Sequence, residues 1–273
     1  MKHGLFSFLV AFLVTVSCSF ASAQTLLVSD VDDTIKLAHV QSYKDMIYYA
    51  FDDSSRFMGM SDLYNLIVQD NPDMQVVYLS RAPTWIMKKR HLSLLKKGLF
   101  PEGRYIGRSS LSRSTHKVDA LREVIEEFKP KKVVLIGDNG EADPAVYAQI
   151  GEEYRASGIQ FFQFIRIVYS KSVYTPVKPA TLISSQTGFV TPIEISLELE
   201  SQGLLHKTSV EKLLATKGAD LSNPDLKERN GEYAFPYFVD CSSFQWRWDG
   251  RLAEFAELLV LKTRIFKRCG LNP

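Results

Sequence analysis

Cysteine is scarce in this sequence, since three residues among 273 are too few for a disulfide-stapled scaffold or a structural zinc site. Net charge is almost absent as well, because 33 basic residues balance 31 acidic ones. That balance does not suggest a nucleic-acid-binding protein, which would need a basic stripe. No internal repeat or low-complexity tract is present. The remaining composition, 45% hydrophobic and 23% charged residues, is ordinary for a folded chain and excludes disordered, collagen-like and coiled-coil classes.

The amino-terminal segment has the pattern of an export signal. Its apolar run at residues 5–16 follows Lys2 and is shorter than the ~20 residues that a membrane span needs. Small residues at 21–23 complete a signal peptide, which we expect to occupy residues 1–23 and to be cleaved after Ala23. A lipoprotein anchored at Cys18 is the alternative. We therefore predict a secreted or periplasmic protein with no transmembrane segment after cleavage.

Removal of this leader leaves two cysteines, Cys241 and Cys269. In an oxidising compartment the two could form a disulfide bond. Two separate buried thiols are the other interpretation, and the sequence does not decide between them.

Short apolar runs alternate with helical patterns between residues 25 and about 170. Strands are expected at 26–28, 76–79, 133–136 and 161–169, and helices at 60–68, 84–97, 117–128 and 144–155. This alternation predicts an α/β fold with a mostly parallel sheet and helices on both faces. Beyond about residue 176 a linker rich in Pro and Ser precedes helical patterns at 192–205, 208–216 and 250–268. We therefore divide the chain into 24–175 and a mainly helical extension or lid at 176–273.

Three of the expected strands end in polar residues, namely Asp30, Ser80 and Asp138. The ligand crevice of an open α/β sheet lies beyond the carboxyl ends of its strands, so these side chains can converge. The first strand continues into a run of acids, Asp30, Asp32 and Asp33, which repel one another unless a cation is present. Carboxylate oxygens suit Mg²⁺. A solvated acidic turn is the plainer interpretation, and the position directly after a buried strand argues against it.

Five motifs carry a resemblance to a known family. They are SDVDDTIK at 29–36, GMSDLY at 59–64, YLSRAP at 78–83, His116-Lys117, and LIGDNGEADPAVY at 135–147. The DxDDT motif resembles motif I of the haloacid dehalogenase superfamily of phosphohydrolases. The whole set, in order between about 25 and 170, resembles the catalytic domain of actin-patch-protein-type phosphatidate phosphatases. The resemblance implies a three-layer Rossmann-like fold of this type with a minimal cap.

The resemblance also implies catalytic roles. Asp30 would be the nucleophile that forms an aspartyl-phosphate. Asp32 would be the general acid and then the general base, with its backbone carbonyl as a metal ligand. Ser80 and Lys117 would bind the phosphate, although a capping serine and a solvated lysine are the common alternatives. For Asp33 we favour a capping role in the loop.

The metal site implied by the resemblance holds Mg²⁺ between Asp30, Asp32, Asp138 and Asp143. For Asp138 a turn residue is the alternative. Asp143 precedes Pro144 and also suits an N-cap. His116 could be a second phosphate ligand, but a packed or surface histidine is the more common case.

The spacing between these motifs leaves no room for a large cap over the site. An open site favours phosphate groups on large or interfacial substrates, and the resemblance points to a lipid at a membrane surface, phosphatidate. A broad phosphatase for soluble or protein phosphoesters and a non-catalytic envelope-binding module are the alternatives. A basic stretch at 88–90 and 96–97 could attract anionic headgroups or could simply be a solvated helix face. The aromatic stretch at 235–248 suits a membrane interface, but core packing is favoured.

Overall fold

The computed structural model describes residues 25–109, 115–171 and 178–272. The leader expected at 1–23, with Cys18, lies outside the described residues. A six-stranded sheet organises the chain in the order β4-β3-β1-β5-β6-β7, and every neighbouring pair is parallel. Its strands are β1 (Thr25–Asp30), β3 (Gln75–Pro83), β4 (Arg104–Arg108), β5 (Lys132–Asp138), β6 (Gln160–Arg166) and β7 (Gln186–Phe189).

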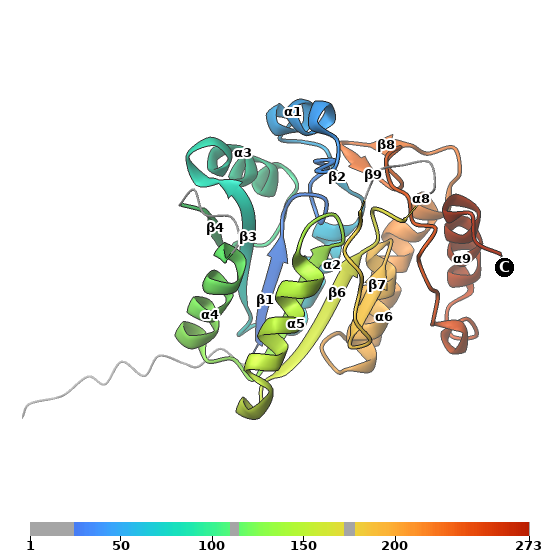
Figure 1. Cartoon of the computed structure of the whole chain (residues 1–273). Helices are drawn as coiled ribbons and strands as arrows, with labels where there is room; N and C mark the ends of the chain where they lie inside the picture. Colours follow the sequence, from blue (N-terminus) through green and yellow to red (C-terminus); the bar gives the residue numbers. More distant parts are fainter. Residues whose placement is uncertain (1–24, 110–114, 172–177, 273) are drawn as a thin grey trace, which may run out of the picture.

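Helices cover both faces of the sheet and make three layers (Figure 1). On one face α4 (His116–Phe128) and α5 (Asp143–Glu153) pack against alternate residues of β1, β3 and β5, such as Val28 and Leu135. The other residues of these strands, such as Leu27 and Val134, face a larger core with α2 (Met60–Asp70), α3 (Thr84–Lys97) and α6 (Pro192–Ser201). The predicted α/β fold with a mostly parallel sheet is therefore confirmed.

Several elements were not expected from the sequence. Helix α1 (Tyr43–Phe51) buries only Tyr49, so its sequence shows no core-facing stripe. Strand β4 lies at the sheet edge and buries only Arg108, and β7 has four residues. A small second sheet joins β2 (Arg56–Phe57), β9 (Glu232–Tyr233) and β8 (Glu228–Arg229). Edge strands and two-residue strands carry too little hydrophobic pattern to be recognised.

The carboxyl-terminal segment is helical as expected and packs on the larger core. After α6 come α7 (Lys207–Leu213), a π-helical turn (Leu214–Gly218), α8 (Ala219–Ser222), a 3-10 turn (Asp249–Arg251) and α9 (Ala256–Cys269). Strand β7, which lies beyond residue 176, extends the sheet beside β6. The larger core takes side chains from both parts of the chain. The division at 175/176 stays a prediction.

The described structure settles two open questions about this segment. Cys241 and Cys269 form a disulfide bond, which ties α9 to the loop before it. Phe244 and Trp248 are buried in the core, so core packing is the correct interpretation of these two aromatic residues. None of the helices in the described parts of the chain has the length and hydropathy to span a membrane.

Candidate active site

Strands β3, β1 and β5 are neighbours at the centre of the sheet, and their polar residues meet at its carboxyl edge. Asp30 ends β1 and Asp138 ends β5. Ser80 lies within β3 rather than at its end, because the strand continues to Pro83 after a register shift between Ser80 and Pro83. All three residues are buried. The expected convergence of Asp30, Ser80 and Asp138 at one edge is therefore confirmed.

A buried lysine lies between two of the carboxylates. Lys117, in the first turn of α4, donates from Nζ to Asp30 Oδ1 at 2.7 Å and also to Asp143 Oδ1. Burial alone would lower the pKa of Lys117, but the charges of Asp143 and Asp30 raise it well above its ordinary value. The lysine is therefore a fixed positive charge, although its position near a helix amino terminus is unfavourable for a cation.

Asp30, Asp138 and Asp143 form one buried group in which one carboxylate oxygen from each residue lies within 4.8 Å of those of the other two. Thr34 Oγ1 joins two of them, because it lies 3.2 Å from Asp30 Oδ2 and 3.5 Å from Asp138 Oδ2. Gly137 is required beside this group, since a Cβ there would lie 2.3 Å from Asp143 Oδ2. Among the residues that the structure describes, these three carboxylates outnumber the one lysine that contacts them.

This excess of negative charge appears in the titration behaviour of the group. Burial raises the pKa of Asp30 well above its usual range, and the charges of Asp143 and Asp32 raise it further, against the lowering effect of Lys117. Burial and the charges of Asp143 and Asp30 raise the pKa of Asp138 in the same way. A hard divalent cation would neutralise the surplus charge, and carboxylate oxygens are the ligands that Mg²⁺ prefers. The donor set therefore fits a metal ion, held by Asp30, Asp138 and Asp143.

The Asp32 carboxylate is not part of this acidic group and instead contacts Ser80 and His91. Ser80 Oγ donates to Asp32 Oδ2 at 3.2 Å, and His91 Nε2 lies 3.4 Å from Asp32 Oδ1. Burial alone would raise the pKa of Asp32, but the interaction with His91, with smaller contributions from Lys36 and Ser80, lowers this pKa below its ordinary value. The backbone carbonyl remains the atom through which the family resemblance links Asp32 to a metal.

Two neighbouring residues have structural contacts. Asp33, at φ 57°, accepts hydrogen bonds from the backbone N–H groups of Ala38, His39 and Val40, as a loop-capping residue does. His116 is half-buried and lies 3.2 Å from the backbone carbonyl of Ser80. Burial lowers the pKa of His116, which makes it a weak candidate for a charged phosphate ligand.

Sequence reasoning missed three residues that support the site. His91 is fully buried, with Nδ1 2.9 Å from the Tyr105 hydroxyl and Nε2 facing Asp32. Thr34 bridges two acids of the metal group. Arg166, at the end of β6, donates from Nε to the Thr34 carbonyl at 3.0 Å and so holds the loop that follows β1. The threonine was visible in the DxDDT motif, but only the folded structure brings the histidine and arginine to this place.

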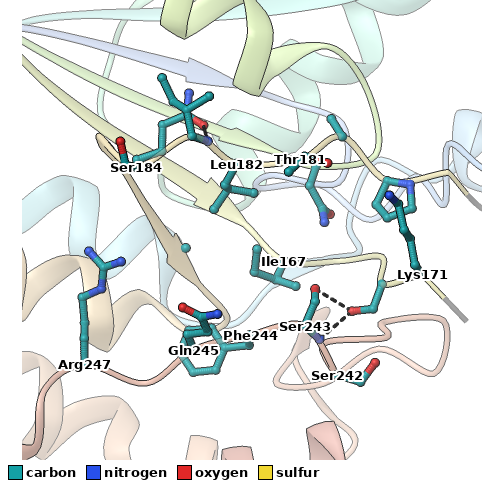
Figure 2. Close-up of a pocket in the computed structure, with 17 residues that line it drawn as sticks. Ile167, Lys171, Thr181, Leu182, Ser184, Ser242, Ser243, Phe244, Gln245 and Arg247 are labelled. Carbon is teal, nitrogen blue, oxygen red and sulfur yellow. Dashed lines mark hydrogen bonds between the residues drawn. The ribbon is translucent and has the colours of Figure 1, made fainter.

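A cavity of about 540 Å³ lies beside β6 and β7, between the loops at 179–184 and 242–247 (Figure 2). Asn139, which follows Asp138 directly in the sequence, lines this cavity. Its side chain donates to the Tyr169 carbonyl and accepts from the backbone N–H groups of Val168 and Tyr169. The cavity is also lined by Lys171, and the residues that follow Lys171 lie outside the described part of the chain. We therefore assign no ligand to this cavity.

A parallel α/β sheet that gathers carboxylates, a serine and a lysine at its carboxyl edge defines a candidate phosphohydrolase. Comparison with known proteins identifies the family. The sequence model of the phosphatidate phosphatase APP1 catalytic domain matches residues 25–162, about half of the chain, and the chain belongs to this family of phosphoric monoester hydrolases. A curated relative, phosphatidate phosphatase APP1 of Saccharomyces cerevisiae, is 25% identical over 157 residues. The alignment covers 52% of this chain and 25% of the yeast protein, so the chain spans about a quarter of that relative.

Proposed function

We propose that this protein hydrolyses phosphatidate to diacylglycerol and phosphate, with Mg²⁺ as cofactor and an aspartyl-phosphate on Asp30 as intermediate. The contact of Lys117 with both Asp30 and Asp143 is the observation that carries the proposal. It places a fixed cation on the expected nucleophile and on one expected metal ligand at once. The family match supports the substrate.

The chain's own residues supply the steps of the reaction. An oxygen of Asp30 attacks phosphorus, and the bond from phosphorus to the leaving alkoxide breaks. Asp32 gives its proton to that alkoxide, then takes a proton from the water that cleaves the aspartyl-phosphate. A phosphate dianion beside Asp32 raises its pKa and favours the protonated form that the first half-reaction needs.

Two residues would hold the phosphoryl group in place. Ser80 Oγ is already oriented toward Asp32, and Lys117 offsets the negative charge of both nucleophile and substrate. Mg²⁺ held by Asp30, Asp138, Asp143 and the Asp32 carbonyl would neutralise charge on the phosphate oxygens during transfer.

The test is an assay of phosphate release with Mg²⁺ and with EDTA, on phosphatidate in detergent micelles and on a soluble aryl phosphate. Asp30→Asn removes the nucleophile and should abolish release. The matched control is Asp119→Asn, which changes an exposed carboxylate on α4 whose partner is Arg122. No metal-dependent release from either substrate would refute the enzymatic proposal. Release from the soluble ester alone would refute the lipid substrate and favour a broad phosphatase.

We also propose that the protein is exported, to the periplasm or the medium. The signal-peptide pattern at 1–23 supports export, and the disulfide between Cys241 and Cys269 suits an oxidising compartment. Fractionation of expressing cells, followed by amino-terminal sequencing, should find the protein outside the cytoplasm and beginning at Gln24. A cytoplasmic protein that keeps Met1 would refute export, and lipid on Cys18 would show the anchored form instead.

A further inference from the structure

Large apolar side chains are exposed on α1 and on the first turn of α3. Trp85 is 80% exposed, Tyr43 75%, and Tyr48 and Phe51 70% each. Met46, Ile47 and Ile86 are exposed to a smaller extent. Tyr43, Ile47 and Phe51 are spaced four residues apart and therefore share one face of α1. We call this set of seven residues the α1–α3 apolar surface.

The two helices are joined to each other by side-chain contacts. The Arg90 guanidinium of α3 lies 4.7 Å from the centre of the Phe51 ring. Asp53, just after α1, accepts hydrogen bonds of 2.6 Å from Ser93 Oγ and from Lys97 Nζ. These contacts hold the end of α1 against α3, so the two helices and their exposed apolar residues have a fixed arrangement.

This surface borders the candidate active site. Helix α3 follows directly after β3, so Trp85 lies only five residues beyond Ser80. The α1 backbone is held by buried Lys36, which donates to the Tyr49 carbonyl at 2.6 Å and follows the DxDDT loop. Both helices lie at the carboxyl end of β1 and β3 (Figure 1). The α1–α3 apolar surface therefore lies at the same end of the sheet as the acidic group.

The chemistry of the surface matches an anionic lipid interface. Tyr and Trp are the residues that favour the boundary between water and acyl chains. Helix α3 has no acidic residue, and its exposed Lys88 and Lys89 form no ion pair in the described parts of the chain. Basic residues beside a set of aromatic anchors attract anionic headgroups while the rings insert.

Resting on the proposed function, we propose that the α1–α3 apolar surface inserts into an anionic lipid membrane and presents the active site to phosphatidate there. Insertion would place the site at the depth of the headgroups, where the phosphate monoester lies. A soluble ester needs no such docking, so its hydrolysis is independent of the surface.

The test compares Tyr48→Ser/Trp85→Ser with the unsubstituted protein and with Leu259→Ser/Val260→Ser. The control changes two exposed apolar residues of α9, which are 57% and 58% exposed. Binding is measured by co-sedimentation with vesicles of phosphatidylcholine and phosphatidylglycerol, and activity on phosphatidate in the same vesicles and on a soluble aryl phosphate. We expect Tyr48→Ser/Trp85→Ser to weaken vesicle binding and phosphatidate turnover on the order of tenfold or more, with soluble-ester turnover unchanged.

A second variant separates the basic contribution. Lys88→Ala/Lys89→Ala should weaken binding to these vesicles but not to vesicles of phosphatidylcholine alone. Unaltered vesicle binding by Tyr48→Ser/Trp85→Ser overturns the proposal. The proposal is also overturned if the unsubstituted protein binds no vesicles and forms a dimer in analytical ultracentrifugation that Tyr48→Ser/Trp85→Ser, but not the control variant, dissociates. A protein that binds vesicles through this surface but releases no phosphate would refute the proposed function and leave the docking surface supported.

Discussion

The lysine between the two aspartates offers a sharp test of the site's electrostatics. In Lys117→Met the side chain keeps most of its volume and loses its charge, leaving Asp30 and Asp143 buried without their cation. Removing one partner of a buried ion pair costs about 3 to 5 kcal/mol, because an uncompensated charge remains in a poorly polar environment. For a chain of this size each kcal/mol shifts Tm by roughly 2 to 4 °C. We therefore expect Tm to fall on the order of 10 °C in EDTA.

The matched control is Arg122→Met on the same helix. Arg122 pairs with Glu153 at 2.6 Å and with Asp119 at 3.2 Å, but all three side chains are substantially exposed. Surface ion pairs contribute little to stability because water screens them, so Tm should fall by no more than a few degrees. The difference between the two variants isolates the effect of burial.

The same two variants also test the metal site when their Tm is measured with and without Mg²⁺. Lys117→Met leaves the acidic group one charge more negative, so Mg²⁺ should bind it more tightly and raise its Tm by more than that of the unsubstituted protein. At a hundredfold excess over Kd, binding stabilises a protein by about 2.7 kcal/mol. Differential scanning calorimetry in EDTA and in Mg²⁺ measures both effects. Equal decreases of Tm in Lys117→Met and Arg122→Met would refute this reasoning. A Tm of Lys117→Met that is the same in EDTA and in Mg²⁺ would refute it as well.

Three further substitutions test the surroundings of the site and the C-terminal segment. Cys241→Ser/Cys269→Ser removes the disulfide bond that closes a loop of 28 residues, so the free energy of unfolding in urea should fall by roughly 3.5 kcal/mol. An unchanged urea midpoint of unfolding would contradict this expectation. Gly137→Ala places a Cβ against the Asp143 carboxylate, so calorimetry should show a smaller Mg²⁺-induced rise in Tm than for the unsubstituted protein. An equal rise in Tm would count against the assigned metal group. Asp33→Ala removes the acceptor of three backbone N–H groups and should cost about 1 to 3 kcal/mol in the same urea experiment, whereas a neutral result would show that the cap is dispensable.

The central part of the fold could be predicted because its strands are buried on both faces. Residues 26–28 and 133–136 are continuous apolar runs, and each is followed within two residues by the acid that the site uses. Ligands of such sheets bind at the carboxyl ends of parallel strands, and this rule predicts that Asp30, Ser80 and Asp138 lie together. Their catalytic roles stay predictions.

Other features depend on contacts that the sequence does not display. Helix α1 escaped recognition because its apolar residues face outward instead of forming a buried stripe. His91 lies in a basic stretch and reaches Asp32 only through the packing of α3. Arg166 has backbone carbonyls and the rings of Phe57 and Phe189 as partners, contributed by separate elements. Such residues need the three-dimensional arrangement before their surroundings can be known.

Phosphorylation of Asp30 during turnover is the step on which the proposed mechanism depends. Phosphatidate carrying a radioactive phosphate group would be mixed with the protein and Mg²⁺, and the reaction would be quenched in acid within the first turnover. We predict label on the peptide that carries Asp30, released by hydroxylamine, absent in Asp30→Asn and retained in Asp119→Asn. Phosphate release without any labelled protein, or label on a different peptide, would contradict the claim.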